Sequence, residues 1–263
     1  MLVKDKVIIV SGIGPGLGIK LAIEAAREGA RVAVAARTPA NLDEAERRMR
    51  EAAPNCEVLK QPTDIVDRAQ CKRLVEMTMV RFGRIDGLIN SAYFHGNFSG
   101  MGESDLDVVR KAFDTNLIGT MNLTQETIPA MKKGGGGAIV MINTMSTRQP
   151  NNSSVAAYAA SKGALAVAAK YLARDVGPSN IRVNSLLPGW MWGTPVQTYV
   201  KQAAVAEKVP EDVIVARIVA GIPLRRIVKD EECARAALFL ASDYASAITG
   251  VQLDANGGQF MAC

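Results

Sequence analysis

The stretch that decides the fold is Lys6–Gly29, which reads KVIIVSGIGPGLGIKLAIEAAREG. It opens with β-branched residues, passes through a glycine-rich turn, and continues with apolar residues at helical spacing. Glycines in such a turn let backbone N–H groups approach a phosphate at the positively polarised end of a helix. A strand, glycine turn and helix in this order predict a binding site for the pyrophosphate of a dinucleotide. The residues predicted to form it are Gly12, Gly14, Gly16, Leu17 and Gly18.

The rest of the chain alternates short apolar runs with longer alanine-rich helical patterns. Strands that are apolar along their whole length indicate a parallel sheet covered by helices on both faces. The predicted fold class is therefore α/β, a single-domain Rossmann fold over residues 1–263 with a doubly wound parallel sheet of about seven strands. A break in the alternation predicts a small helical substrate-loop insertion at about residues 190–221. The predicted strands begin at Lys6, Arg31, Glu57, Asp86, Ala138, Arg182 and Val251.

Composition and charge narrow the classes of protein to consider. The net charge is +5, but the 31 Lys and Arg residues are scattered among 26 acidic ones, so we expect no nucleic-acid partner. The four cysteines form no C-x-x-C pair, and there is one histidine, which predicts no metal site and reduced thiols in a cytoplasmic setting. The long apolar stretch at 155–176 carries several charges, and no leader is visible, so we expect neither membrane insertion nor secretion.

The end of the second predicted strand bears on cofactor choice. It reads Ala35-Ala36-Arg37-Thr38, where an acidic side chain would bind the 2′-hydroxyl of the adenosine ribose. Here a neutral alanine is followed by a guanidinium, which suits a 2′-phosphate. The sequence therefore favours NADP(H) over NAD(H). If Arg37 is only a solvated residue at the start of a helix, the preference stays open.

A tyrosine and a lysine lie one helical turn apart in Tyr158-Ala159-Ala160-Ser161-Lys162. Positions i and i+4 share one face of a helix. An ammonium held near a phenol favours the phenolate, so we expect Lys162 to lower the pKa of Tyr158 from about 10 toward neutral pH. The pair predicts that Tyr158 acts as an acid or a base. Taken alone, the same spacing also fits an ordinary surface helix.

Taken together, these motifs resemble the short-chain dehydrogenase/reductase family over essentially the whole chain. The resemblance implies that Tyr158 donates or accepts a proton, and that Lys162 tunes it and holds the hydroxyls of the nicotinamide ribose. Asn116 would kink its helix and anchor a water in a proton relay. The matching elements are the glycine turn, Asp64, Asn90, Asn116, Tyr158, Lys162, Pro188-Gly189, Ile248-Thr249-Gly250 and Gly257-Gly258.

The resemblance also implies further contacts with the dinucleotide. Asp64 would meet the adenine amine, and Asn90 would meet the adenosine-side ribose through its backbone. The other residues expected to bind the cofactor on this basis are Ile65, Pro188, Gly189, Met191 and Thr194.

The chain departs from the family pattern in two places. Tyr93 stands where relatives commonly have a small glycine. The family's catalytic serine, counted back from Tyr158, falls on Met145, which cannot polarise a carbonyl. Counting forward along the fifth strand gives Thr144, and one extra loop residue would reconcile the two counts. Thr144 is therefore the first candidate for the substrate-polarising hydroxyl, and Ser146 is the second.

These residues predict an oxidoreductase that interconverts a small-molecule ketone and secondary alcohol. An apolar cluster favours a bulky cyclic or aromatic substrate, although such clusters also serve packing. We interpret His95 as a bystander in its loop.

The alternatives to this oxidoreductase are an enoyl reductase, which separates its Tyr and Lys more widely, a sugar epimerase, and a non-catalytic dinucleotide-binding regulator. The family pairs subunits through helices, so we expect a homo-oligomer, a tetramer. The apolar candidates are Tyr93, Phe94, Phe98, Met101, Met145, Trp190, Trp192 and Tyr199.

Overall fold

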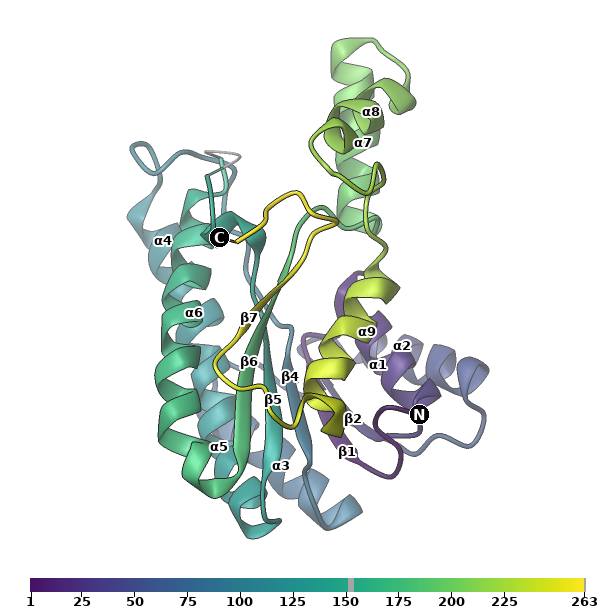
Figure 1. The fold of residues 1–263 in the computed structure, drawn as a ribbon, viewed down its shortest axis with the longest axis vertical. Helices are drawn as coiled ribbons and strands as arrows, with labels where there is room; N and C mark the ends of the chain where they lie inside the picture. The colour runs from purple at the N-terminus through teal and green to yellow at the C-terminus, as the bar shows by residue number, and fades with distance from the viewer. Residues whose placement is uncertain (151–153, 263) are drawn as a thin grey trace.

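The computed structural model describes residues 1–150 and 154–262, and within them the chain forms one parallel sheet of seven strands (Figure 1). The strand order is β3-β2-β1-β4-β5-β6-β7, so the sheet grows outward in both directions from the β1–β4 pair. The predicted α/β class and doubly wound sheet are confirmed. The strands are β1 Val7–Ser11, β2 Arg31–Ala36, β3 Val58–Pro62, β4 Gly87–Asn90, β5 Gly137–Ile142, β6 Ile181–Pro188 and β7 Gln252–Ala255.

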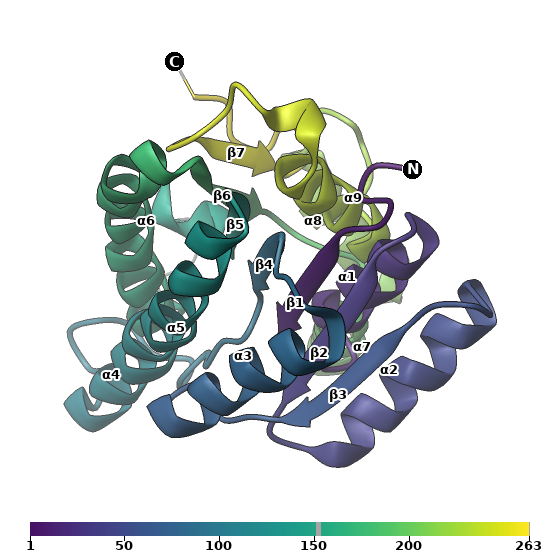
Figure 2. The same cartoon turned by 90° about the horizontal axis from the view of Figure 1, so that it is seen from below.

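Helices pack on both faces of the sheet (Figure 2). Side chains alternate along β1, so that Ile8 and Val10 join the core on one face and Ile9 joins the core on the other. No helix of the described residues is long and apolar enough to span a bilayer. One face is covered by α1 Leu17–Arg27, α2 Pro39–Ala52 and α9 Asp230–Ala241, the other by α3 Arg68–Phe82, α5 Thr120–Lys133 and α6 Ala156–Val176.

The turn between β1 and α1 is closed by contacts that only glycine allows. Gly12 has a φ of +85°, and a Cβ on it would lie 2.2 Å from the Ala92 nitrogen. A Cβ on Gly18 would lie 2.1 Å from the Gly12 oxygen. α1 can therefore begin tight against the carboxyl end of β1, at the point where the strand order reverses. Parallel sheets of this kind bind their ligands at that point.

Two helical segments interrupt the regular alternation. α4 Leu106–Phe113 passes into α5 through a π-helical segment, η1 Asp114–Gly119, which contains Asn116 and matches the kink expected there. α7 Thr194–Glu207 and α8 Glu211–Ala220 fall in the predicted insertion and project beyond the carboxyl ends of the strands (Figure 1). They share a small apolar cluster of their own, so the insertion is held by its own packing.

Candidate active site

Lys162 is a buried amine at the end of β5. It lies in the second turn of α6, is 2% exposed, and its Nζ donates a hydrogen bond of 2.7 Å to the carbonyl oxygen of Ile142, the last residue of β5. Burial lowers the pKa of Lys162 from 10.5 to about 7, because the charged form loses its hydration. The amine can therefore exist in either protonation state near neutral pH.

Tyr158 lies one turn before Lys162, and its pKa does not move as the sequence predicted. Burial raises the pKa of the phenol above its ordinary value of 10.0, and the nearby Tyr93 raises it further. The expected lowering by Lys162 is therefore wrong for this structure. The physical reason is that burial disfavours both charges: the phenolate loses solvation, and the amine is directed to the Ile142 carbonyl and partly neutral. A hydrogen bond with the Thr144 side chain acts in the lowering direction.

Thr144 is the hydroxyl that meets the phenol. It follows β5, is 9% exposed, and lies close enough to Tyr158 to act on the pKa of the phenol. Ser146 lies one hydrogen bond further away, since the Thr144 hydroxyl donates to its Oγ over 3.3 Å and accepts from its N–H over 3.2 Å. Met145 is buried at 5% exposure. Counting forward along β5 thus selects the residue that lies beside Tyr158.

Asn116 links α6 to the loop after β4. Its side chain is fully buried in η1, where its Oδ1 accepts from the Phe94 N–H at 2.7 Å and its Nδ2 donates to the Phe94 carbonyl at 2.9 Å. The same Nδ2 donates to Ser161 Oγ at 2.8 Å, and that hydroxyl donates to the Tyr158 carbonyl. The amide therefore fixes the backbone around Tyr158, and its implied role in a proton relay stays a prediction.

A hollow of about 180 Å³ gathers several of the predicted cofactor residues. Gly12, Arg37, Asp64 and Ile65 all line it, although they come from different loops. Arg37 is exposed and makes no hydrogen bond or ion pair with any other described residue. Its guanidinium is therefore available to an anion in the hollow.

The remaining predicted residues border the same region. The turn is open on its outer side, because nothing lies within 4 Å of where a Cβ on Gly14 or Gly16 would stand. The Asn90 side chain points inward, with its Nδ2 donating to Thr124 over 3.0 Å, and its contact with a ribose through the backbone stays a prediction.

The segment after β6 lies at the same edge of the sheet as the catalytic cluster. Pro188 ends β6, beside the end of β5 that accepts from Lys162. Gly189 packs against Asn256, Met191 is paired with Val228, and Thr194 opens α7. All of these residues lie at the carboxyl edge of the sheet, as their sequence positions predicted. Their contacts with a cofactor stay a prediction.

Comparison with known proteins agrees with this geometry. A family model described as "Enoyl-(Acyl carrier protein) reductase" matches residues 12–259. A 3alpha-hydroxysteroid dehydrogenase of Mediterraneibacter gnavus is 31% identical over 259 residues, covering 98% of each chain. The chain belongs to the short-chain dehydrogenase/reductase family.

Solved structures of this family superpose closely on the chain. An NAD⁺-bound xylitol dehydrogenase gives a TM-score of 0.89 at 27% identity, covering 98% of this chain and all of the other. A variant of actinorhodin polyketide ketoreductase with NADPH gives 0.88 at 28% identity, covering 97% of each. The first of these structures holds NAD⁺ and the second NADPH. The likeness therefore supports a nicotinamide dinucleotide and does not decide between NAD(H) and NADP(H).

Two features of this dehydrogenase/reductase were missed or misjudged at the level of sequence. His95 was interpreted as a bystander, but its ring lies parallel to that of Tyr158, with centroids 5.1 Å apart. Asp230 is 3% exposed, burial raises the pKa of its carboxyl, and a Cβ on Gly193 would lie 2.3 Å from its Oδ2. The only sequence signal near His95 was the unusual Tyr93, two residues before it. The sequence carried no signal for the burial of Asp230.

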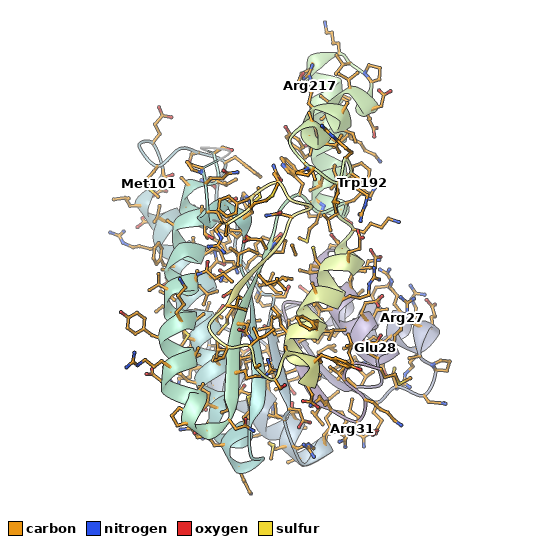
Figure 3. The ribbon with its side chains drawn as sticks, viewed as in Figure 1. Arg27, Glu28, Arg31, Met101, Trp192 and Arg217 are labelled. Carbon is orange, nitrogen blue, oxygen red and sulfur yellow. The ribbon has the colours of Figure 1, made fainter. Side chains whose placement is uncertain are left out.

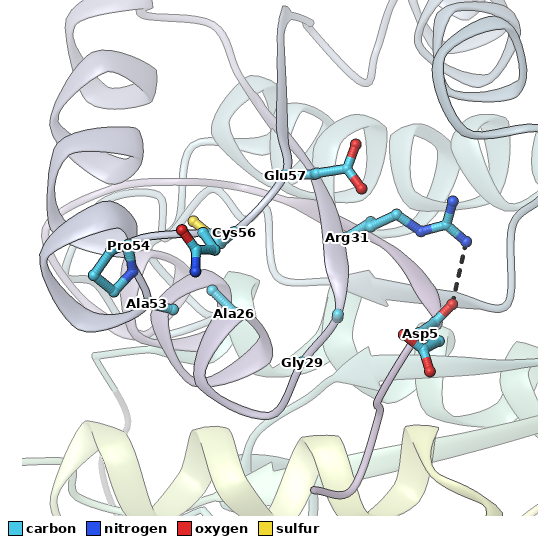
Figure 4. Close-up of a pocket in the computed structure, with 10 residues that line it drawn as sticks. Asp5, Ala26, Gly29, Arg31, Ala53, Pro54, Cys56 and Glu57 are labelled. Carbon is cyan, nitrogen blue, oxygen red and sulfur yellow. Dashed lines mark hydrogen bonds between the residues drawn. The ribbon is translucent and has the colours of Figure 1, made fainter.

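A larger hollow of about 570 Å³ lies away from this site (Figure 4). It is formed where α1 and α2 end and β2 and β3 begin, and none of the predicted site residues lines it. In it Arg31 donates to the Asp5 carbonyl over 3.2 Å. The residues predicted for catalysis and cofactor binding therefore lie away from this hollow.

Replacing Lys162 with Met is expected to stabilise the fold at neutral pH, by on the order of 3 kcal/mol. The methionine side chain has a shape similar to that of lysine but carries no amine that loses its hydration on burial. The amine's pKa falls from 10.5 in the unfolded chain to about 7 in the folded one, so the wild type gains stability as the pH rises between those values. The advantage of K162M should therefore shrink as the pH approaches 10.5. Urea unfolding across this range measures it.

Lys170→Met, at an exposed position of the same helix, is the matched control and should change stability little at either pH. A K162M variant less stable than the wild type at neutral pH would show that the hydrogen bond to Ile142 outweighs the cost of burial.

Proposed function

We propose that this chain is an NADP(H)-dependent oxidoreductase that interconverts a ketone and a secondary alcohol. The observation that carries the proposal is that the Thr144 side chain lies close enough to the Tyr158 phenol to act on its pKa, one helical turn from the buried Lys162 amine. Two hydroxyls thus lie together at the carboxyl edge of the sheet, and the amine follows one helical turn along α6. This is the arrangement that a carbonyl oxygen needs in order to be held and protonated.

The residues at the crevice fit a nicotinamide dinucleotide. Gly12 and Gly18 leave no room for a side chain, while Gly14 and Gly16 are open, so the turn can receive a pyrophosphate on its outer side. When bound, the dinucleotide supplies or accepts the hydride. The residues proposed to hold it are the glycine turn with Leu17, Arg37, Asp64, Ile65, Asn90, Lys162, Pro188, Gly189, Met191 and Thr194.

In this proposal, Tyr158 gives its phenolic proton to the substrate oxygen in reduction and takes it back in oxidation. Thr144 donates to the same oxygen as negative charge develops on it, an effect worth a few kcal/mol in comparable sites. The Lys162 amine, whose pKa is near neutrality, is suited to return a proton toward Tyr158. The Ser146 N–H orients the Thr144 hydroxyl by donating to its oxygen, which leaves the Thr144 proton for the substrate. Asn116 holds α6 against the loop after β4 through its hydrogen bonds to Ser161 and Phe94.

The surroundings support a bulky apolar cyclic or aromatic substrate. Tyr93 is 52% exposed and lies edge-on to Tyr158, with ring centroids 5.9 Å apart. Met101 and Trp192 lie on opposite sides of the carboxyl edge of the sheet (Figure 3). A polycyclic steroid of the kind named for the Mediterraneibacter gnavus relative is such a molecule. We further propose that the enzyme works in the cytoplasm as a homo-oligomer, a tetramer.

The preference for NADP(H) is proposed to depend on Arg37. Arg37→Leu should weaken NADPH binding by about tenfold or more, because a charge-assisted hydrogen bond is worth about 1.5–3 kcal/mol, and should leave NADH binding nearly unchanged. Fluorescence titration of both dinucleotides measures this. Arg73→Leu, an exposed arginine of α3, makes the same change in net charge and is the control. Equal loss of both dinucleotides would contradict the assignment.

The catalytic assignment is tested by Tyr158→Phe, which removes only the phenolic oxygen. Turnover with NADPH and a panel of cyclic ketones should fall by about 10²–10⁴-fold, while the Kd for NADPH stays within about twofold. Tyr171→Phe, an exposed tyrosine of the same helix, should retain full turnover. If the wild type binds NADPH but oxidises it with none of the ketones in the panel, the result would favour the non-catalytic regulator. Consumption with an enoyl thioester alone would favour an enoyl reductase.

A further inference from the structure

We propose that His95 is a positioning residue, whose ring holds the phenol of Tyr158 in the orientation that proton transfer requires. The inference rests on the proposed function for its catalytic consequence, but its structural part stands on ring geometry alone. It gives a role to the one histidine of the chain, which none of the other functional assignments uses.

The rings around Tyr158 restrict it from two directions. The imidazole of His95 lies 5.1 Å from the Tyr158 centroid at an interplanar angle of 15°, which is a stacked arrangement. Phe98 lies behind the imidazole, with centroids 4.6 Å apart at 37°. Tyr93 meets the edge of the Tyr158 ring at 64°. One face and one edge of the catalytic phenol are thus covered by aromatic side chains, and such contacts have preferred geometries.

The loop that carries the imidazole is itself fixed. Asn116 both accepts from the N–H and donates to the carbonyl of Phe94, the residue just before His95. Gly96, just after it, has a φ of +78°, and a Cβ there would lie 3.2 Å from a methyl of Val108. The backbone is therefore held on both sides of His95. Asn116 also bonds to Ser161, so the same amide connects the loop to the helix that carries Tyr158.

The His95 imidazole is in its uncharged form, which favours a role in stacking over a role in acid–base chemistry. Burial lowers the pKa of His95 below 6.5, so the ring is uncharged at neutral pH. Its Nδ1 is enclosed, and the hydrogen bond that acts on its pKa is with the backbone of Gly96, the next residue. A half-buried, uncharged ring of this kind contributes its flat surface. If the stack were lost, the phenol could turn away from Thr144, and small misplacements of a reacting group reduce turnover strongly.

Two variants separate the ring from the imidazole chemistry. His95→Ala should lower kcat by about tenfold or more while the Kd for NADPH stays within about twofold. His95→Phe keeps a flat ring and should restore kcat to within about twofold of the wild type. Tyr171→Ala, an exposed aromatic of α6, is the control for loss of a ring. Unchanged kcat in His95→Ala, or no recovery in His95→Phe, would overturn the proposal.

A second readout does not depend on turnover. Because the chain has one histidine, the imidazole protons of His95 give resolved NMR signals that no other residue can contribute. Stacking should displace them by the ring current of Tyr158, and this displacement should persist in Tyr158→Phe and disappear in Tyr158→Leu. Identical shifts in both variants would overturn the stack. If the displacement is present but no ketone is turned over, the proposed function fails while the ring arrangement stands.

Discussion

The burial of one amine at the carboxyl end of β5 is the constraint on which the site depends. Lys162 reaches the Ile142 carbonyl with a single hydrogen bond of 2.7 Å and has almost no contact with water. A charge in such a place is costly, and the lowered pKa expresses that cost. A fold built only for stability would place an apolar side chain there. Functional sites are where such local costs are expected.

The geometry around this amine follows from the doubly wound sheet. β5 and β6 end side by side, so Thr144, the start of the segment after Pro188, and the first turns of α6 meet at one edge. The glycine turn lies at the same edge, beside the β1–β4 pair from which the strand order runs in opposite directions. Sheet topology thus brings a proton-transfer cluster and a phosphate-binding turn together, although the two are far apart in the sequence.

Much of this could be predicted from the sequence, because the relevant signals are local. The apolar runs gave the strands, the glycines gave the first turn, and the spacing of Tyr158 and Lys162 placed them on one helix face. Counting along β5 reached Thr144 because a strand tolerates no insertions, whereas the loop after it does. The kink expected at Asn116 came from the family resemblance and not from any periodicity in the residues, and the sequence did not indicate that the segment would be π-helical.

What the sequence could not give are effects that depend on burial and on contacts between distant segments. Spacing places an ammonium near a phenol, but it does not show that burial disfavours the charged form of each, so the direction of the Tyr158 pKa was predicted wrongly. The stack of His95 on Tyr158 joins a loop to a helix more than 60 residues later. Asp230 beneath Gly193 is a contact of the same kind.

The central claim is that Tyr158 and Thr144 jointly hold the reacting oxygen, with Lys162 behind them, beside a dinucleotide in the glycine-lined crevice. A crystal structure of the ternary complex with NADP⁺ and a cyclic alcohol tests it most directly. The alcohol oxygen should lie within hydrogen-bond distance of both hydroxyls, and the nicotinamide ribose should lie within reach of the Lys162 amine. An alcohol oxygen held elsewhere, or a dinucleotide bound away from the glycine turn, would contradict the account.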